Sequence, residues 1–182
     1  MKSISKFIAY VLRHHPSEIG IELDSQGWAD VGELIEGINK TGRFIDMALL
    51  QKVVANDEKG RYSFNEDMTK IRANQGHSVD VDVDFEQRIP PDFLYHGTAQ
   101  KYLERIKQNG ILKMTRQYVQ LSDNVKTAFN VGSRHGVPVV LKIDTKRMAH
   151  DGYVFYISSN GVWQSQDILW KYVLEVINKS DT

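Results

Sequence analysis

Arginine and histidine side chains that lie close together are the residues of this sequence best suited to chemistry. Arg13 and His14 adjoin in the segment Arg-His-His-Pro at residues 13–16. A guanidinium matches two oxygens of a phosphate, and a nearby imidazole can donate to another oxygen. The alternative is an ordinary helix terminus, where the helix dipole favours cations. The pair therefore indicates either a phosphate site or a solvated helix end.

Three further polar segments could contact a ligand. Residues 72–78 (RANQGHS) follow a predicted strand, residues 95–98 (YHGT) join a predicted strand to a predicted helix, and residues 132–136 place Arg134 and His135 between two glycines. A glycine at a strand-to-helix turn lets a ligand approach the backbone, and a helix N-terminus favours anions. The alternative for each segment is an ordinary structured turn.

Several other kinds of site are excluded by composition and motif. The chain has no cysteine, which excludes disulfides, thiolate zinc sites and cysteine nucleophiles. It has no His-x-x-x-His pair, so we expect no metal site. It also lacks the Gly-x-x-x-x-Gly-Lys-Ser/Thr loop of Walker-type nucleotide sites and the Gly-x-Ser-x-Gly elbow of hydrolases.

The net charge gives no support to a nucleic-acid partner. The 182 residues carry 23 basic and 23 acidic side chains; residues 1–90 have a net charge of −4 and residues 91–182 one of +4. A polyanion site must therefore be a local cluster. No apolar run approaches the roughly 20 residues of a membrane helix, and the N-terminus is amphipathic rather than signal-like. We expect a cytoplasmic protein without a membrane partner.

The first half of the chain has the element order of a winged-helix domain. Apolar spacing predicts a helix over residues 4–14, and Asp30 and Asp46 are positioned to cap two more helices. Residues 61–64 and 69–72 are expected to form a hairpin, and residues 19–23 a short strand. Three helices followed by a hairpin are typical of winged helices, which bind nucleic acids or proteins.

The second half is predicted to be a mixed α/β lobe after a linker at residues 89–92. The alternating residues 79–86 indicate a charged edge strand before it. Thr98 is expected to cap a helix that Gly110 ends. Strands are predicted at residues 93–96, 118–121 and 137–143, a helix at 123–131, and further strands near 153–157, 162–166 and 172–177. The expected fold class is α+β, with lobes at residues 1–88 and 89–182.

The order and spacing of short motifs give the chain a family resemblance. The motifs are VLRHHP (11–16), QGW (26–28), KGRY (59–62), IRANQGHS (71–78), LYHGT (94–98), VQLS (119–122), RHG (134–136) and NGVW (160–163). Over about residues 3 to 177, the sequence resembles the RNA 2′-phosphotransferases (tRNA 2′-phosphotransferase), and RANQGHS is the most specific of these strings. The resemblance implies an N-terminal winged-helix RNA-binding lobe and a C-terminal NAD-binding lobe like that of ADP-ribosyltransferases.

This family resemblance also implies an activity. The enzymes remove an internal 2′-phosphate left at an RNA splice junction, with NAD as co-substrate and no metal. The RNA 2′-phosphate first attacks C1″ of the nicotinamide ribose and expels nicotinamide. The ribose 2″-hydroxyl then attacks the phosphorus, which releases RNA with a 2′-hydroxyl and ADP-ribose 1″,2″-cyclic phosphate. We expect a monomer whose partners are NAD and RNA with an internal 2′-phosphate.

Motif by motif, the resemblance implies three groups of site residues. The catalytic group is Arg13, His14, Arg61 and Arg116. The NAD-binding group is His96, Gly97, Thr98, Ser122, Arg134 and Gly136. The group that binds RNA or lies at the lobe junction is Arg72, Asn74, Gln75, His77 and Ser78.

Two departures from related patterns affect the interpretation. Gln120 stands where the family usually has a histidine; glutamine can hydrogen-bond a ribose hydroxyl but cannot carry a charge. Val162 stands where protein-modifying ADP-ribosyltransferases usually have a catalytic glutamate, which argues against protein modification. Two alternatives stay open: ADP-ribosylation of terminal phosphates of nucleic acid, and a non-catalytic module that binds RNA or protein.

Overall fold

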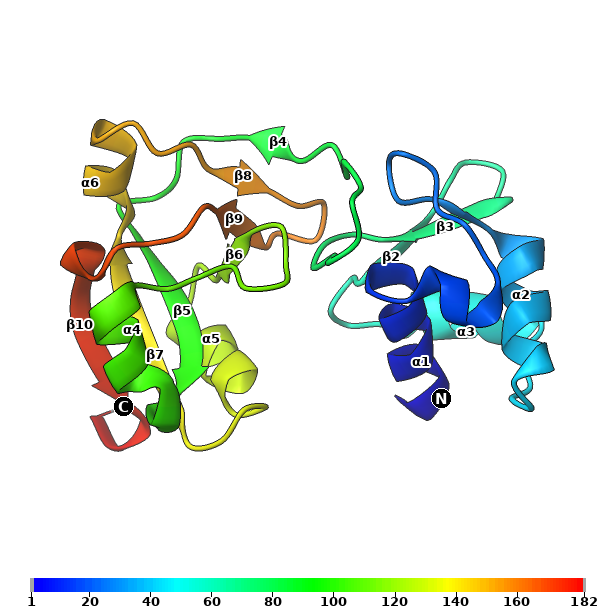
Figure 1. The fold of residues 1–182 in the computed structure, drawn as a ribbon, viewed down its shortest axis with the longest axis horizontal. Coiled ribbons are helices and arrows are strands. Elements are labelled where there is room, and N and C mark those ends of the chain that lie inside the picture. Colours follow the sequence, from blue (N-terminus) through cyan, green and yellow to red (C-terminus); the bar gives the residue numbers. More distant parts are fainter. Residues whose placement is uncertain (1, 182) are drawn as a thin grey trace. The chain divides into compact units, whose positions relative to one another are not determined.

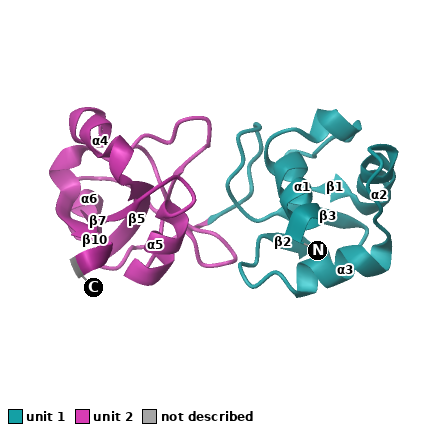
Figure 2. Cartoon of the chain, turned by 90° about the horizontal axis from the view of Figure 1, so that it is seen from below, with its two compact units in different colours: residues 1–85 teal, residues 86–182 magenta. Residues whose placement is uncertain are grey.

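The computed structural model describes residues 2–181 and divides into two compact units (Figure 2). Unit 1 comprises residues 1–85 and unit 2 residues 86–182. The sequence-based boundary lies at residue 88; the division falls earlier because β4 (Glu86–Gln87) pairs with β8 (Tyr156–Ile157) of unit 2. In the described residues the fold is mixed α/β, with six α-helices and three small antiparallel sheets (Figure 1).

Unit 1 begins with three α-helices that match the predicted positions: α1 (Lys2–Arg13), α2 (Val31–Lys40) and α3 (Met47–Ala55). The two predicted caps are confirmed. The Asp30 carboxylate accepts a hydrogen bond from the Glu33 amide at 2.9 Å, and that of Asp46 accepts one from the Leu49 amide at 2.7 Å. Such caps satisfy amides that have no partner in the first helical turn.

The sheet of unit 1 has the strand order β1-β3-β2. The predicted hairpin is confirmed as β2 (Tyr62–Phe64) and β3 (Lys70–Ala73), and the two-residue β1 (Ala29–Asp30), which was not predicted, pairs with β3. One apolar core joins the helices to this sheet through Ile8, Leu12, Leu34 and Ile71, all fully buried. The core holds the end of α1 against the residues that follow β3.

Two predicted strands of unit 1 are wrong. Residues 16–19 form a short 3₁₀ helix, η1 (Pro16–Ile19), and residues 21–23 form no strand, although Ile21 is buried. Residues 79–85 follow an alternating burial pattern, with Val81 and Val83 buried, but they pair with no strand. The alternation of apolar and charged residues therefore reflects the burial of these valines within unit 1 and not a strand at a sheet edge. Only residues 86–87 are in a strand.

Unit 2 contains two antiparallel sheets. The first has the order β10-β7-β5, from β10 (Val173–Asn178), β7 (Pro138–Asp144) and β5 (Phe93–Ala99). The second has the order β4-β8-β9-β6, with β9 (Trp163–Ser165) and β6 (Val119–Leu121). A bridge between Tyr95 and Ser122 links β5 to the residue that follows β6. The predicted strands of this half are thereby confirmed, with β5 three residues longer than expected.

The helices of unit 2 are α4 (Leu103–Asn109), α5 (Val125–Gly132) and α6 (Thr145–His150), with α5 packed on β5 and β7 (Figure 1). Thr98 does not cap a helix. It lies inside β5, and a 3₁₀ turn, η2 (Gln100–Tyr102), precedes α4. Gly110 ends α4 as predicted, with a φ of +79°. Short 3₁₀ helices also occur at η3 (Trp170–Tyr172) and η4 (Lys179–Asp181).

A membrane-spanning helix is not found in the described part of the chain: none of its helices has the length and apolar character to cross a bilayer.

Candidate functional site

The C-terminal end of α1 and the segment after β3 meet in unit 1. The carbonyl oxygen of Arg13 accepts hydrogen bonds from the amides of Ser78, at 3.0 Å, and Val79, at 3.4 Å. The Nδ1 atom of His14 lies 2.9 Å from the Ser78 hydroxyl oxygen. The structure thus brings together two predicted site segments that are more than 60 residues apart in sequence.

His77 lies beneath this contact and is 1% exposed. Neither ring nitrogen has a hydrogen-bond partner among the described residues. Burial lowers the pKa of His77 to about 4, helped by the positive charges of Arg13, His14 and Arg72. The imidazole is therefore neutral at pH 7 and lies close to the positive charges of Arg13 and Arg72, an arrangement that would attract an anion.

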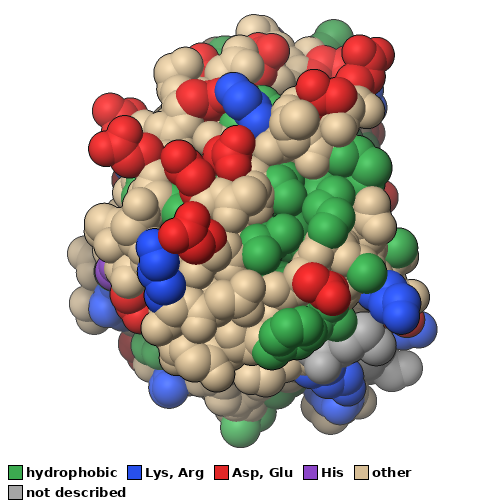
Figure 3. All heavy atoms as spheres, turned by 90° about the vertical axis from the view of Figure 1, so that its right-hand side faces the viewer, with side chains coloured by type: hydrophobic (Ala, Val, Ile, Leu, Met, Phe, Trp, Pro, Cys, Tyr) green, Lys and Arg blue, Asp and Glu red, His purple; other side chains and the backbone are tan. Residues whose placement is uncertain are grey.

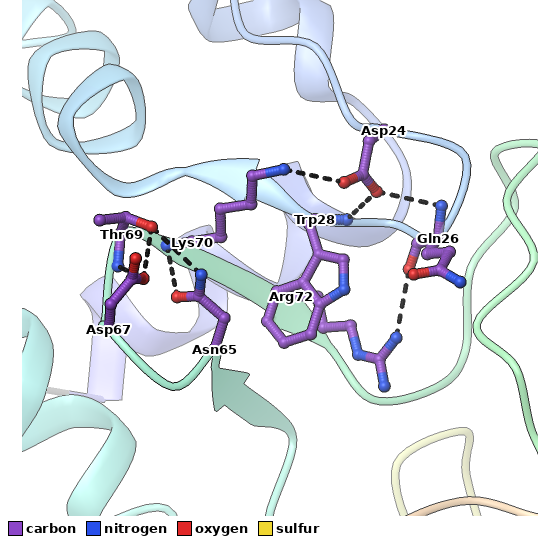
Figure 4. A network of polar contacts seen from close by, with 8 residues as sticks. All are labelled: Asp24, Gln26, Trp28, Asn65, Asp67, Thr69, Lys70 and Arg72. Atoms are coloured by element: carbon purple, nitrogen blue, oxygen red, sulfur yellow. Dashed lines mark hydrogen bonds and ion pairs between the residues drawn. The ribbon is translucent and has the colours of Figure 1, made fainter.

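Arg72 is placed by a stack on an aromatic ring (Figure 4). Its guanidinium carbon lies 4.5 Å from the centroid of Trp28, and its Nη1 approaches the Gln26 carbonyl oxygen at 3.5 Å. The carboxylate of Asp24 accepts bonds from the Gln26 and Trp28 amides, both at 3.0 Å, so it fixes the loop that carries the ring. Burial lowers the pKa of Arg72, and its buried Nε has no partner among the described residues.

Arg61 belongs to a second network of unit 1. Its Nη1 lies 3.0 Å from the Asp57 carboxylate, which is 4% exposed, and 3.3 Å from the Ser5 hydroxyl. Its carbonyl oxygen accepts a hydrogen bond from the Asn74 amide at 2.8 Å, and the Asn74 side chain donates to the Gly60 carbonyl at 2.7 Å. Asn74 therefore links the turn that carries Arg61 to the RANQGHS segment.

The RANQGHS segment is mostly buried. Asn74, Gln75 and His77 are each less than 10% exposed, whereas Ser78 is exposed beside His14. The Ser63 hydroxyl donates to the Asn74 side-chain oxygen at 2.9 Å. Asn74 is thus a structural support of the site, and Ser78 is the member of the segment with an accessible hydroxyl.

In unit 2, β5 and β6 bring His96 and Gln120 together, and Arg116, which precedes β6, reaches the same place. The Nδ1 atom of His96 lies 3.1 Å from the Gln120 carbonyl oxygen, and the Arg116 Nη1 donates to the Gln120 side-chain oxygen at 2.6 Å. Ser122 exchanges backbone hydrogen bonds of 2.8 and 2.9 Å with Tyr95, which places it beside His96. Burial lowers the pKa of His96, so its ring favours the neutral form.

The loop after α5 adds two positive groups to the same region of unit 2. The pKa of Arg116 is lowered by burial of its guanidinium, and the positive charge of Arg134 lowers this pKa further. The charge of His135 likewise disfavours protonation of His96. Gly136, with a φ of +142°, ends this loop next to Ala99. The structure therefore collects His96, Ser122, Arg116 and Arg134 in one polar region.

Gly97 and Thr98 have a packing role that differs from the one inferred from sequence. A Cβ atom at Gly97 would lie 1.8 Å from the Ala128 carbonyl oxygen, and one at Gly132 would lie 2.5 Å from the Thr98 carbonyl oxygen. The glycines thus allow α5 to approach β5 closely. This contact, rather than a strand-to-helix turn open to a ligand, explains the glycine at position 97.

Sequence reasoning missed the side chains that hold the candidate residues in place. Asp57 precedes Arg61 by four residues and Ser5 lies on α1, but neither position carries a motif. Trp28 belongs to the motif QGW, but nothing in that motif indicates its contact to Arg72. Within residues 2–181, no three histidine or acidic side chains come close enough to hold a metal ion.

Comparison with known sequences identifies the class of protein as an RNA phosphotransferase. The profile described as "RNA 2'-phosphotransferase, Tpt1 / KptA family" matches residues 1–167. The chain belongs to this family, and the resemblance seen in its motifs is confirmed.

Curated relatives align with this chain over nearly their whole length. The chain is 49% identical to a "Probable RNA 2'-phosphotransferase" of Flavobacterium johnsoniae over 172 residues, which are 94% of each chain. It is 49% identical to a protein of the same description from Fusobacterium nucleatum, over 93% of this chain and 96% of the relative. A third, from Acaryochloris marina, is 45% identical over 97% of each chain.

Proposed function

We propose that this chain is an NAD-dependent RNA 2′-phosphotransferase that transfers an internal RNA 2′-phosphate to NAD. In this proposal unit 1 is a winged-helix RNA-binding lobe and unit 2 is a lobe like that of ADP-ribosyltransferases. The observation that carries the proposal is the group formed in unit 1 by Arg13, His14, Arg72, His77 and Ser78.

This group has the donors and the charge that a phosphate requires. Arg13 and His14 adjoin the exposed Ser78 hydroxyl, and the buried nitrogens of His77 and Arg72 lack hydrogen-bond partners among the described residues. A buried polar group without a partner costs about 1–3 kcal/mol. A bound anion, or water, would offset that free-energy cost. A phosphate would therefore bind more favourably at this group than at a solvated helix end, which has no such buried nitrogens.

The polar region of unit 2 fits the ribose and phosphate groups of NAD. The proposal assigns His96 and Ser122 to ribose hydroxyls and phosphate oxygens, and Arg134 to the negative charge of the pyrophosphate, while the buried Thr98 keeps its packing role. Gly97 and Gly136 would act through backbone shape. When bound, NAD supplies a ribose carbon whose leaving group is nicotinamide. The protein then needs to orient that carbon toward the RNA phosphate.

The reaction explains why arginine and histidine suffice. The nucleophile is already a phosphate, so no activated serine or cysteine is required. Arg13, His14 and Arg61 would position this anion, and Arg116 would stabilise negative charge on the phosphoryl oxygens. Gln120 accepts a bond from Arg116 and thereby directs its guanidinium.

The test is incubation with NAD and a short RNA that bears one internal 2′-phosphate, followed by mass analysis. We expect nicotinamide, RNA with a 2′-hydroxyl and ADP-ribose cyclic phosphate. Release of nicotinamide with ADP-ribose retained on a terminal RNA phosphate, and no cyclic phosphate, would support the alternative transferase. If no product forms and RNA is bound unchanged, the chain is a binding module and the proposal is wrong.

Substitutions test the assigned phosphate group. Arg13→Ala and His14→Ala should each lower the rate about 10²- to 10³-fold, the usual cost of removing a donor that stabilises developing charge. At Arg61 the variant is Arg61→Lys, because Arg61→Ala would leave the buried Asp57 carboxylate without its cation. We expect this variant to lower the rate as well. Arg88→Ala, at an exposed ion pair with Glu86, is the matched control. Near-normal turnover of all three site variants would contradict the assignment.

A further inference from the structure

The exposed side of α1 carries a row of basic side chains. Lys2, Lys6 and Arg13 are spaced i, i+4 and i+11, which places them on one face of the helix. Lys2 and Lys6 are exposed, and among the described residues neither has an acidic partner within 4.0 Å. Arg13, at the end of the row, belongs to the proposed phosphate group.

This helix differs in charge from the unit that contains it. No acidic residue occurs in α1, although residues 1–90 carry 15 acidic and 11 basic side chains. Figure 3 shows acidic side chains over the upper part of one face of unit 1, and lysine and arginine more often toward its lower edge. Figure 1 places the start of α1 at that lower level. A polyanion would therefore be attracted to this helix more than to the rest of unit 1.

A ladder of planar groups, each in contact with the next, runs beside the basic row. The Arg43 guanidinium lies 3.8 Å from the centroid of Phe7, the Phe7 ring stacks with Tyr10 at 6.3 Å, and Tyr10 contacts His15 at 4.6 Å. Tyr10 and His15 are exposed, and the Tyr10 hydroxyl donates to the Glu18 carboxylate at 2.8 Å, which fixes its ring.

A pocket marks the start of the ladder. Its lining consists of Lys2, Ser3, Lys6, Phe7 and Arg43. It thus combines cations with an aromatic ring. Proteins that bind single-stranded nucleic acids use this combination, with bases on rings and phosphates on basic side chains.

We propose that the exposed face of α1 binds the single-stranded RNA that flanks the phosphorylated nucleotide. Bases would stack on the exposed rings of Tyr10 and His15, which Phe7 supports from below, and backbone phosphates would follow Lys2 and Lys6 toward Arg13. The 12 residues of α1 span about 18 Å, which is long enough to contact several nucleotides of a single strand. The inference rests on the proposed function, because that function supplies the RNA.

The third helix offers less to an RNA than α1. In helix-turn-helix proteins the second helix of the motif reads the nucleic acid, and α3 holds that position here. Its sequence contains Lys52 as its one charged residue and no aromatic side chain. The distribution of cations and rings in unit 1 therefore favours α1.

A neutralised variant and a matched control test the basic row. Affinity for a ten-nucleotide single-stranded RNA without a 2′-phosphate is measured by fluorescence anisotropy over a range of salt concentrations. For Lys2→Gln/Lys6→Gln, the slope of log affinity against log salt should fall by about 1.4, because each single-strand phosphate contact contributes about 0.7. The control Lys40→Gln/Lys52→Gln removes the same charge from exposed sites on α2 and α3 and should keep the original slope. Equal slopes for the two variants, or no RNA binding by the unchanged protein, would overturn the proposal.

The ladder is tested at Tyr10, which is exposed and outside the apolar core. Tyr10→Ala should weaken RNA binding roughly 5- to 100-fold, the range for loss of one base–aromatic stack. Tyr10→Phe keeps the ring, loses the bond to Glu18, and should bind normally. If Tyr10→Phe is as weak as Tyr10→Ala, the Glu18 bond rather than stacking matters and the ladder assignment is wrong.

Catalysis separates this inference from the proposed function. With substrates that carry a 2′-phosphate, Lys2→Gln/Lys6→Gln should lower kcat/KM at least several-fold on a ten-nucleotide RNA and leave a dinucleotide unaffected, since the dinucleotide is too short to reach both lysines. Equal losses on both substrates would contradict the α1 surface. If the unchanged protein acts on neither substrate, the proposed function fails, and the binding measurements alone decide the surface.

Discussion

At the scale of single residues, His77 links stability to pH. Its pKa is lowered to about 4, whereas an unfolded chain keeps a histidine pKa near 6.5. Between these values the unfolded state binds the extra proton, so the free energy of unfolding falls as the pH is lowered from about 6.5 toward 4. The contribution at neutral pH is about 3 kcal/mol.

Urea unfolding at pH 7 and at pH 4 checks this linkage. The unchanged protein should lose about 3 kcal/mol more than His77→Gln over this interval, because glutamine takes up no proton. Carboxylates titrate in both proteins, so the difference between the two isolates His77. Identical pH dependence would show that the ring is already protonated or solvated in the fold.

Arg116 should contribute more to the second chemical step than to the first. It lies in unit 2, bound to Gln120, where it would face the phosphate once that group has joined the ribose. Arg116→Ala should still expel nicotinamide but accumulate RNA carrying 2′-phospho-ADP-ribose, since charge on the phosphoryl oxygens loses its fixed partner. Gel or mass analysis at early times detects the adduct.

Arg116→Lys is the companion variant. Lysine should restore the second step only in part, because a point charge cannot reproduce the paired donors of a guanidinium. Equal loss of nicotinamide release and final product in Arg116→Ala, without a trapped adduct, would assign Arg116 to binding or to the first step.

At the scale of elements, Asn74 fixes the turn between α3 and β2 to the segment after β3. It is 4% exposed, donates to the Gly60 carbonyl and accepts from the Ser63 hydroxyl. Asn74→Ala should lower the free energy of unfolding by about 1–3 kcal/mol, the cost of buried groups left without partners. It should also reduce activity, because the backbone of Arg61 hydrogen-bonds to the same residue.

Chemical denaturation and steady-state kinetics measure the two effects separately. Asn74→Asp keeps the acceptor for Ser63 and loses the donor to Gly60. It should therefore perturb the Gly60–Arg61 turn while keeping the Ser63 contact. An Asn74→Ala enzyme with unchanged stability and kinetics would mean that other contacts hold the turn.

Elements with a local cause were predictable from sequence. Helices α2 and α3 begin at capping aspartates, α4 ends at Gly110, and β7 begins with an apolar run over residues 138–141. The errors in the predicted secondary structure arise where contacts between distant segments determine the local conformation. Val81 and Val83 alternate because unit 1 buries them, and Gly97 is explained by the approach of α5. The six-residue α6 carried too few periodic positions to be recognised.

The sequence indicated which residues to consider for the candidate site, but not the contacts that hold them in place. The motifs named Arg13, His14 and His77, and the family assignment confirms the resemblance that selected them. The Asp57 partner of Arg61 and the Trp28 partner of Arg72 depend on packing between distant segments. A single sequence holds no spacing that reports such contacts.

At the scale of the whole molecule, the proposed chemistry should be independent of divalent metal ions. Arginine and histidine provide the positive charge on both units, and the described residues contain no group of three histidine or acidic ligands. Dephosphorylation of RNA with a 2′-phosphate should therefore continue in excess chelator. Loss of activity that added magnesium restores would contradict this expectation. An RNA without secondary structure is the appropriate substrate, so that the metal does not act through RNA folding.

Each unit is one continuous stretch of the chain, and this affects how the protein is made on the ribosome. Residues 1–85 contain the whole core and sheet of unit 1, together with Arg13, His14 and His77. Synthesis of residues 86–182 then takes about 5 to 20 seconds in addition, and N-terminal domains generally fold first. Unit 2 differs, because β7 pairs with β10, which ends at Asn178, so its first sheet closes only when translation is nearly complete. The nascent chain can therefore fold unit 1, with Arg13, His14 and His77 in place, well before the first sheet of unit 2 can form.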